Sequence, residues 1–359
     1  MQQYIDLMKK ILDEGHLLPD RTGDNRKKIF GHQMRFNLQD GFPLVTTRQI
    51  SYKTIVKELI WFISGSSNNK DLTDNNVNIW TNWSVTETDI DKFLERYEPA
   101  HAKDLKPAFV EHTLYSVGPM YGEAWRHAPN RFYNPFFPKV TEEDVEKKRL
   151  ALIKEHYNDE KPTKPDGSDV SFIEYLQVKY YEEIDQLNDL IIGLKRRPYS
   201  SRHIINAWIP EFIPFENISA AENVIIGKGA LAHCHVLQQY LVLPPKHDGG
   251  KKRLSLMMTQ RSTDVPLGLV FNIAQYAMLL SMIAQVVDME PFEFIWSGGD
   301  NHIYGTQIEK ANIQIQREPL PLPKLVLNPD IKDLFDFKAS DIEIINYQCH
   351  EKIDYPISI

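Results

Sequence analysis

Residues 271–287, FNIAQYAMLLSMIAQVV, are apolar on nearly every face and decide what kind of fold the chain can adopt. A surface helix carries one apolar stripe, whereas a stretch that is apolar all round predicts a helix buried in the middle of a protein. Asn272 stands at its start, either as the N-cap of the helix or as an amide that offers a donor and an acceptor to a ligand. The rest of the chain must therefore cover this helix on every side.

Strands and further helices are predicted on both sides of the central stretch. Alternation of apolar and polar residues is typical of half-buried strands, and apolar residues spaced three and four apart are typical of helices. The predicted strands are 28–47 (with a turn at Asp40-Gly41), 202–209, 235–244 and 253–262, and the predicted helices are 1–15, 52–64 and 172–196. These elements predict an α+β fold in which helices pack against one large β-sheet.

Two segments interrupt this pattern of strands and helices. Residues 84–117 are polar and read as irregular, and residues 130–171 are highly charged and include KPTKPDGSD. We expect both to be insertions on the surface of a single domain that spans residues 1–359, rather than linkers between domains.

The bulk composition argues against several classes of protein. A formal net charge of −8 does not favour a broad basic surface for nucleic acid. Two cysteines in 359 residues cannot form a disulfide framework and suit a reducing compartment. The N-terminal stretch lacks the apolar core of a signal peptide, and no stretch approaches the length needed to span a membrane. We therefore expect a cytoplasmic protein that binds neither nucleic acid nor membrane.

Cys234 lies between His233 and His235 at the start of a predicted strand, and the local sequence leaves its role open. An isolated cysteine is commonly a small buried hydrophobe. A metal site needs three or four converging ligands, but neighbours on a strand point to opposite faces, so we expect no metal here. A nucleophilic cysteine needs a cation that lowers the pKa of its thiol, and Arg261 is the candidate.

Five side chains besides Cys234 could take part in chemistry. Arg261 and Ser262 end a predicted strand, where they form either a surface charge cluster or a site for phosphate oxygens. His302 and Tyr304 lie in the Gly-rich stretch 297–305, which we interpret as a turn; on an extended segment they would share a face and could bind a sugar. Glu58 lies among the apolar positions of helix 52–64, either as an ion-paired core carboxylate or as a functional acid.

Taken together, these stretches resemble the thymidylate synthase family over most of the chain. Long blocks in a fixed order carry the resemblance, and they are far more specific than any single short motif. In chain order the blocks are RTG…IFGHQMRFNLQDGFPLVTT, KELIWFISGSSN, NNVNIWTNW, GPMYGEAWR, SSRHIINAW, AHCHVLQQYLV, QRSTDVPLGLVFNIAQYAMLLSMIAQV, GGDNHIYGTQIE and IDYPISI. The two expected insertions have no counterpart among these blocks.

The resemblance implies a homodimeric methyltransferase whose large mixed sheet forms the dimer interface. It would methylate C5 of dUMP to give dTMP, with 5,10-methylenetetrahydrofolate as co-substrate and no metal. Cys234 would add to C6 of the pyrimidine as a thiolate favoured by Arg261. The residues implied for proton transfer and for stabilising charge on the pyrimidine O4 are Glu58, Tyr121, His235 and Asn272.

The resemblance also implies which residues bind the two substrates. The residues implied for dUMP are Arg21, Arg202, Arg261, Ser262, Asp264, Asn272, His302 and Tyr304, with Arg202 reaching the phosphate site of the partner subunit. Asn272 in place of an aspartate favours dUMP over dCMP. The residues implied for the folate side are Trp80, Asp264, Gly268, Phe271 and the C-terminal tail through Ser358.

Several positions depart from the family pattern. Ser201 stands where the family has a second arginine, and Arg196 or Arg197 could compensate for the missing cation. The other departures are Ser51, Pro266 and Val270 near the folate side, and His233 in place of a proline. Two alternatives stay open: a dUMP hydroxymethylase that adds water instead of hydride, and a nucleotide-binding relative that does not catalyse.

Overall fold

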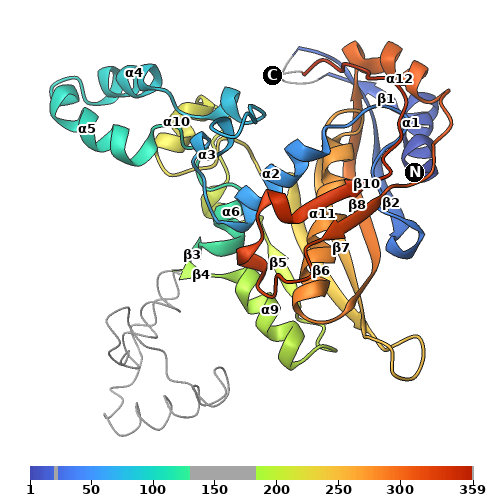
Figure 1. Cartoon of the computed structure of the whole chain (residues 1–359). Helices are drawn as coiled ribbons and strands as arrows, with labels where there is room; N and C mark the ends of the chain where they lie inside the picture. The colour runs from blue at the N-terminus through green and yellow to red at the C-terminus, as the bar shows by residue number, and fades with distance from the viewer. Residues whose placement is uncertain (20–22, 130–182, 358–359) are drawn as a thin grey trace, which may run out of the picture.

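The computed structural model describes residues 1–19, 23–129 and 183–357, and the predicted central helix runs through its middle (Figure 1). This helix, α11 (Gly268–Val286), buries side chains on all its faces. Leu267 occupies the N-cap position, so Asn272 lies inside the first turns and its interpretation as an N-cap is wrong. Among the described residues α11 is the one helix long and apolar enough to span a membrane, so the prediction that no stretch approaches this length is wrong. However, 78 % of its apolar window is buried, as in a core helix.

A six-stranded mixed sheet supports the helices in the strand order β1-β2-β8-β7-β6-β5. Its strands are β1 (His16–Leu18), β2 (Arg26–Asn37), β5 (Ile204–Asn206), β6 (His235–Leu243), β7 (Arg253–Asp264) and β8 (Glu290–Tyr304). β7 and β8 are parallel, whereas the other neighbours in this sheet are antiparallel. Parallel neighbours need a crossover connection, and α11 is that crossover. The predicted α+β fold with one large mixed sheet is confirmed.

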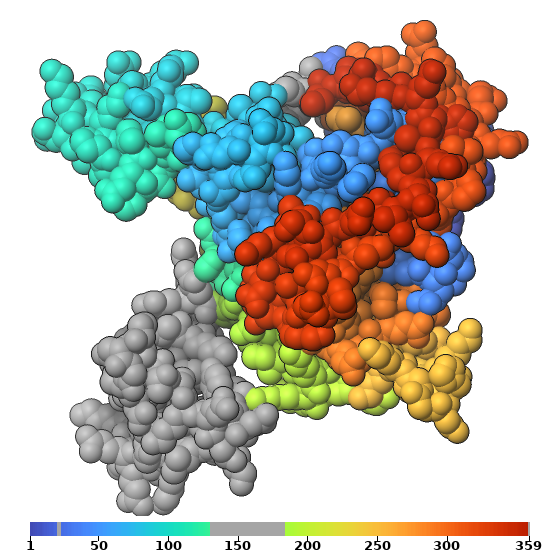
Figure 2. All heavy atoms as spheres, viewed as in Figure 1, coloured from blue at the N-terminus to red at the C-terminus, as the bar shows by residue number. Residues whose placement is uncertain are grey.

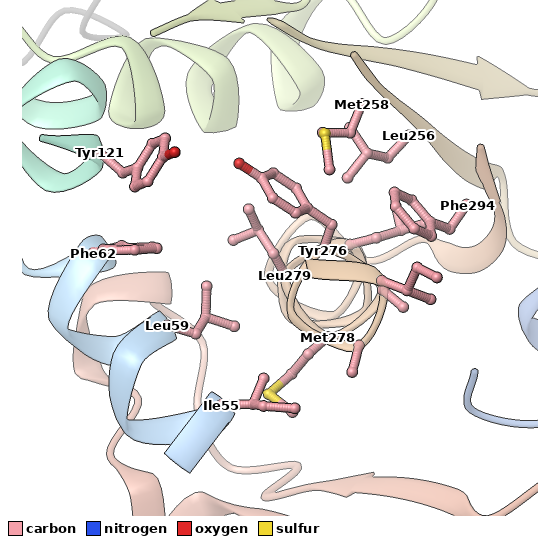
Figure 3. Packing of buried hydrophobic residues seen from close by; sticks show 14 of the residues in the cluster. Ile55, Leu59, Phe62, Tyr121, Leu256, Met258, Tyr276, Met278, Leu279 and Phe294 are labelled. Carbon is pink, nitrogen blue, oxygen red and sulfur yellow. The ribbon is translucent and has the colours of Figure 1, made fainter. Parts of the chain in front are cut away.

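The core lies between the sheet and α2 (Tyr52–Ile63), with α11 in the middle (Figure 3). Met278 and Leu279 of α11 point toward α2, where Ile55 and Leu59 meet them. The sheet side is covered by Leu256, Met258 and Phe294, all fully buried. Each buried side chain of this kind contributes about 1.5–3 kcal/mol, so the apolar face of the predicted helix 52–64 is explained by this contact. Glu58 is carried into the core on the same helix.

The remaining helices and strands surround this core. The helices are α1 (Gln2–Glu14), α3 (Lys70–Thr73), α4 (Glu87–Tyr97), α5 (Ala102–Thr113), α6 (Tyr121–Arg126), α9 (Gln186–Arg196), α10 (Ala220–Ile225) and α12 (Ile308–Gln314). Two small sheets pair β3 (Ala128–Pro129) with β4 (Glu183–Ile184), and β9 (Lys324–Leu327) with β10 (Ile342–Ile345). The helix predicted at 1–15 is confirmed. Of the helix predicted at 172–196, residues through 182 lie outside the described residues, residues 183–184 form a strand, and α9 confirms the rest.

Residues 84–117 are largely helical, so their interpretation as irregular is wrong. α4 and α5 pack on each other and stand out from the main body (Figure 2). A capping box starts α4: the Thr86 hydroxyl accepts a hydrogen bond from the Asp89 backbone N–H, and the Asp89 carboxylate accepts one from the Thr86 backbone N–H. The polar residues of the segment lie on the exposed faces of these helices. The other expected insertion, 130–171, lies outside the described residues.

β8 continues through the Gly-rich stretch 297–305 as far as Tyr304, so the interpretation of this stretch as a turn is wrong. Hydrogen bonding to β2 on one side and β7 on the other holds it extended. The strands predicted at 202–209, 235–244 and 253–262 are confirmed as β5, β6 and β7. β2 confirms the first half of 28–47, whereas 41–47 form no strand.

Candidate active site

Cys234 is half-buried and lies immediately before β6, where its backbone is held from two sides. The Tyr121 hydroxyl oxygen accepts hydrogen bonds from the backbone N–H groups of Cys234 at 3.0 Å and His235 at 3.4 Å. The backbone N–H of Arg261 donates to the Cys234 carbonyl at 2.7 Å. The thiol therefore sits at a strand start whose position is fixed by the first residue of α6 and by β7.

Arg261 provides the cation that the sequence predicts beside this thiol. One guanidinium nitrogen, Nη2, lies 3.8 Å from the Cys234 sulfur. The guanidinium is itself oriented by the backbone carbonyls of Ala232 and His233, which accept from it at 3.1 and 3.2 Å. Burial raises the pKa of the Cys234 thiol, Arg261 lowers it, and Asp300 raises it further, with the net result above the usual value. Arg261 thus acts in the expected direction, but without a bound ligand burial outweighs it.

Glu58 is buried without an ion-pair partner among the described residues, so its interpretation as an ion-paired core carboxylate is wrong. Its two oxygens accept hydrogen bonds from Trp80 Nε1 at 2.8 Å and Gln275 Nε2 at 3.1 Å. Burial raises the pKa of Glu58 to about 7, although both hydrogen bonds act in the opposite direction. A carboxyl group with this pKa can gain and lose a proton near neutral pH.

A chain of hydrogen bonds fixes the side-chain amide of Asn272. The indole N–H of Trp296 donates to Gln260 Oε1 at 2.8 Å, so the Gln260 nitrogen is left to donate to Asn272 Oδ1 at 2.9 Å. His235 also hydrogen-bonds to Asn272, and burial lowers the pKa of this imidazole to about 3. Because an indole is a donor only, the donors and acceptors in this series of hydrogen bonds can be assigned in one way only. This assignment leaves Asn272 Nδ2 without a partner among the described residues, as a donor for a ligand carbonyl.

His302 and Tyr304 lie side by side at the end of β8, with ring centroids 5.2 Å apart. Asp300 contacts His302 Nδ1 at 3.0 Å and accepts from Lys28 Nζ at 3.0 Å. Burial of Asp300 alone would raise its pKa, but the contacts with His302 and Lys28 lower it to about 2. The predicted polyol-binding pair therefore shares a face, with a permanently charged carboxylate behind the imidazole.

The parallel register of β7 and β8 brings the predicted anion and folate residues next to this pair. Ser262 lies opposite Asp300, and Asp264 lies opposite His302. The Asp264 carboxylate accepts hydrogen bonds from the backbone N–H of Leu267 at 3.1 Å and from Gln307 Nε2 at 2.8 Å. Gly268 and Phe271 follow in the first turn of α11. Trp80 joins the group through its bond to Glu58.

Three predicted site residues cannot be placed at this centre within the described residues, and Arg202 is the one of them that the structure describes. Arg21 and Ser358 lie outside the described residues. Arg202 is exposed and precedes β5, whose Asn206 end pairs beside Leu237 near Cys234 while its Ile204 end pairs with Gln239 farther along. Arg202 therefore lies beyond the far end of β5, away from the Cys234 of its own chain.

His233 has no assigned role, and its surroundings are aromatic. Its ring is fully buried and packs against Tyr121 in a T-shaped arrangement, with 5.3 Å between the ring centroids. Burial lowers its pKa to about 4. Tyr121 also stacks on His235 with 4.4 Å between the ring centroids, so two imidazoles contact the tyrosine that anchors Cys234.

The sequence interpretation missed four polar residues that orient the predicted ones: Gln260, Gln275, Asp300 and Gln307. They lie in the same blocks as the predicted residues, but a glutamine or aspartate has no spacing signature that identifies its partner. In the described parts of the chain, no three His, Cys, Asp or Glu side chains gather closely enough to hold a metal ion.

Comparisons with known proteins agree with this geometry. A sequence model of the thymidylate synthase family matches residues 2–359. The thymidylate synthase of Francisella philomiragia subsp. philomiragia is 37 % identical over 359 residues, and that of Francisella tularensis subsp. holarctica is 36 % identical over 359 residues. Both alignments cover all of this chain and all of the relative, so they run through 84–117 and 130–171.

Proposed function

The chain belongs to the thymidylate synthase family, and we propose that it is an active methyltransferase that converts dUMP to dTMP. The co-substrate 5,10-methylenetetrahydrofolate would supply the carbon and the hydride and leave as dihydrofolate. The observation that carries the proposal is the Cys234 sulfur 3.8 Å from the Arg261 guanidinium, beside the amide of Asn272, whose orientation the Trp296–Gln260 chain fixes. Addition to a pyrimidine requires a nucleophile and, close to it, a hydrogen-bond donor that is held in place to bind the pyrimidine carbonyl.

Cys234 would form a bond from its sulfur to C6 of the pyrimidine. The raised thiol pKa describes the site without a nucleotide, so activation depends on the neighbouring cation. The Arg261 guanidinium is already oriented by two backbone carbonyls, which limits the reorganisation needed when the thiolate forms. Tyr121 would assist near the proton on C5, since its hydroxyl lies against the Cys234 backbone.

Three residues would stabilise charge and transfer protons around the pyrimidine O4. The Asn272 amide nitrogen would donate to O4, because Gln260 already donates to its oxygen. His235 would stay neutral, since burial holds its pKa near 3. Glu58 would relay protons through water, which its pKa of about 7 permits.

The remaining predicted residues would position the two substrates. Arg21, Arg261 and Ser262 would bind the phosphate of dUMP, and Arg196 or Arg197 could supply a further cation. His302 and Tyr304 would hold the ribose, and Asp264 would lie between the nucleotide and the folate. The folate side would be lined by Trp80, Gly268, Phe271 and the tail through Ser358.

We further propose a cytoplasmic homodimer of one catalytic domain, in which α4 and α5 belong to a surface insertion. The support is the exposed apolar surface on the sheet: Phe30 is 91 % exposed, Leu241 52 % and Ile204 41 %. Large apolar side chains left exposed on three strands of one sheet are what a partner subunit docked on the sheet would cover. A partner docked on the sheet would also explain why Arg202 lies away from the Cys234 of its own chain.

Two assays test the proposal directly. The enzyme should release tritium from [5-³H]dUMP when methylenetetrahydrofolate is present, because release requires addition at C6 and attack from C5. A protein that binds dUMP without releasing tritium would instead be a non-catalytic relative. Cys234→Ser should bind dUMP but lose nearly all turnover, and a fully active Cys234→Ala would refute the assignment of the nucleophile.

The dUMP hydroxymethylase alternative is separated by the second product. Methylation oxidises the folate, so dihydrofolate absorbance should rise in step with tritium release. Tritium release without dihydrofolate would mean that water replaces hydride. The names of the two Francisella relatives do not favour that outcome.

A further inference from the structure

Gln307 is fully buried in the helical turn Gly305–Gln307, directly after β8. Its side-chain nitrogen donates two hydrogen bonds, to Asp264 Oδ2 at 2.8 Å and to the backbone carbonyl of Pro356 at 3.1 Å. Its side-chain oxygen accepts one from the backbone N–H of Tyr304 at 3.2 Å. One amide therefore joins the end of β7, the end of β8 and the C-terminal tail.

The chemistry of the amide is matched to these three partners. A carboxylate and a backbone carbonyl both need a donor, and a backbone N–H needs an acceptor. Glutamate could satisfy Tyr304 but neither of the other two, and an apolar side chain could satisfy none of them. Because the amide is buried, water does not replace a lost partner without a cost in free energy.

The other tail contacts hold residues 351–355 against different parts of the protein. Lys310 Nζ donates to the Asp354 carbonyl, Arg317 Nη1 donates to the Glu351 carbonyl at 2.7 Å, and the Tyr355 hydroxyl donates to Gln314 at 2.7 Å. These contacts fix the tail to α12 and the residues after it, without touching Asp264.

Arg48 braces the same junction by a separate route. Its guanidinium lies 5.3 Å from the Tyr355 ring centroid and donates to the Pro266 carbonyl at 2.6 Å. Among the described contacts, Gln307 is the one side chain that hydrogen-bonds both the tail and the Asp264 carboxylate.

We infer that Gln307 is a positioning residue that couples the seating of the C-terminal tail to the Asp264 carboxylate. The inference rests on the proposed role of Asp264 between nucleotide and folate. With the tail seated, the amide is held in the orientation that directs its nitrogen at Asp264. With the tail displaced, the amide loses one of its three restraints, and Asp264 loses its fixed donor. Tail seating should therefore affect the folate side more than the nucleotide.

The matched test is Gln307→Met against Gln285→Met in the full-length enzyme. Gln285 is also a glutamine that donates twice, to the carbonyls of Asn328 at 2.8 Å and Ile331 at 3.0 Å, but at the far end of α11. Methionine keeps the approximate volume of glutamine in both cases. Thermal unfolding checks that each variant is folded and measures the general cost of losing two donated bonds.

Gln307→Met should raise the KM for methylenetetrahydrofolate about tenfold, as loss of one hydrogen bond to a charged group predicts, with the Kd for dUMP within about twofold of wild type. Carboxypeptidase should also trim its C-terminus faster. Gln285→Met should change neither quantity. If Gln307→Met leaves both the folate KM and tail trimming unchanged, or weakens dUMP and folate equally, the coupling is refuted.

Gln307→Glu provides a second variant in case the methionine variant does not fold. It keeps an acceptor for Tyr304 but removes both donors, so it should show the same folate defect and the same faster trimming. Wild-type behaviour of Gln307→Glu would refute the inference. Tail trimming needs no turnover, so failure of the proposed reaction appears separately, as wild-type enzyme that releases no tritium.

Discussion

The reactivity of Cys234 depends on a balance at one residue, between burial that raises its thiol pKa and Arg261 that lowers it. Arg261→Gln should therefore move the pH profile of Cys234 alkylation by iodoacetamide upward by about one pH unit. The measurement belongs in a Cys349→Ser background, because Cys349 is the other free thiol of the chain. An unchanged profile would mean that the guanidinium contributes to phosphate binding alone.

Glu58 makes a prediction about stability as well as activity. Its pKa rises from the usual 4.5 to about 7 on burial, which corresponds to about 3 kcal/mol. Because the folded-state pKa is raised, the protonated form favours folding below pH 4.5, and that contribution is lost as pH rises through 7. Relative to wild type, Glu58→Gln should therefore become more stable by about 3 kcal/mol between pH 4.5 and pH 8, while its turnover falls steeply.

Denaturant unfolding at several pH values checks this prediction, with tritium release as the activity assay. A constant stability difference between Glu58→Gln and wild type would show that the carboxyl group titrates normally. Because Gln keeps an acceptor for Trp80, the variant separates loss of the titrating proton from loss of packing.

At the scale of elements, the contact between β7 and α11 orients the amide of Asn272, the residue proposed to bind the pyrimidine O4. Gln260→Met would keep the volume of the side chain but leave Trp296 Nε1 without its acceptor and remove the hydrogen bond that Gln260 donates to Asn272 Oδ1. We expect a loss of about 1–3 kcal/mol in unfolding free energy, from the buried unpaired indole. The kcat/KM for dUMP should fall more than about tenfold, since the Asn272 amide is then free to turn over.

Discrimination against dCMP is the readout that identifies this cause. A free amide presents donor or acceptor with similar ease, so the ratio of Kd values for dCMP and dUMP should shrink in Gln260→Met. Loss of stability with unchanged discrimination would mean that Gln260 merely packs between the strand and the helix.

The elements differ in how far the sequence could predict them. The central helix was predictable because a stretch that is apolar on every face can only be buried. β6 and β7 were predictable because apolar and polar residues alternate along them. Asn272 was misplaced because helix starts depend on backbone capping, and the chain enters α11 at Gly268 without a side-chain cap. For 84–117, the polar composition favours an irregular segment, whereas the Thr86–Asp89 capping box signals the helix start that the structure shows.

The residues of the candidate site also differ in how far the sequence could predict them. The sequence predicts Cys234, Arg261, Asn272 and His302 as site residues because each carries chemistry that suits a nucleotide, and the resemblance gives their order. Gln260 and Gln307 were not, since their function comes from partners brought together by the register of β7 and β8 and by the path of the tail. Such hydrogen-bond partners are brought together only by the folded structure, and they leave no local pattern in the sequence.

For the whole molecule, the sharpest prediction concerns whether a site is shared between two chains. Arg202→Ala and Cys234→Ala should each be inactive as homodimers, the first by lacking the phosphate cation in both sites and the second by lacking both nucleophiles. In a mixed dimer, the site that contains the intact Cys234 receives the intact Arg202 from the other chain. Unfolding the two variants together and refolding them should therefore restore about one quarter of wild-type activity, since half of the dimers are mixed and each has one complete site.

Refolding each variant alone is the control and should restore nothing. If the mixture also stays inactive while size-exclusion chromatography shows dimers, Arg202 does not cross to the partner. If the protein is a monomer, no partner covers the exposed Phe30 and Leu241 on the sheet. The phosphate would then have to be bound by residues of one chain alone. Arg196→Ala and Arg197→Ala would then be the variants that raise the KM for dUMP. In the shared-site dimer, activity should instead fall with protein dilution, as the apolar sheet surfaces separate and each Cys234 loses the Arg202 of its partner.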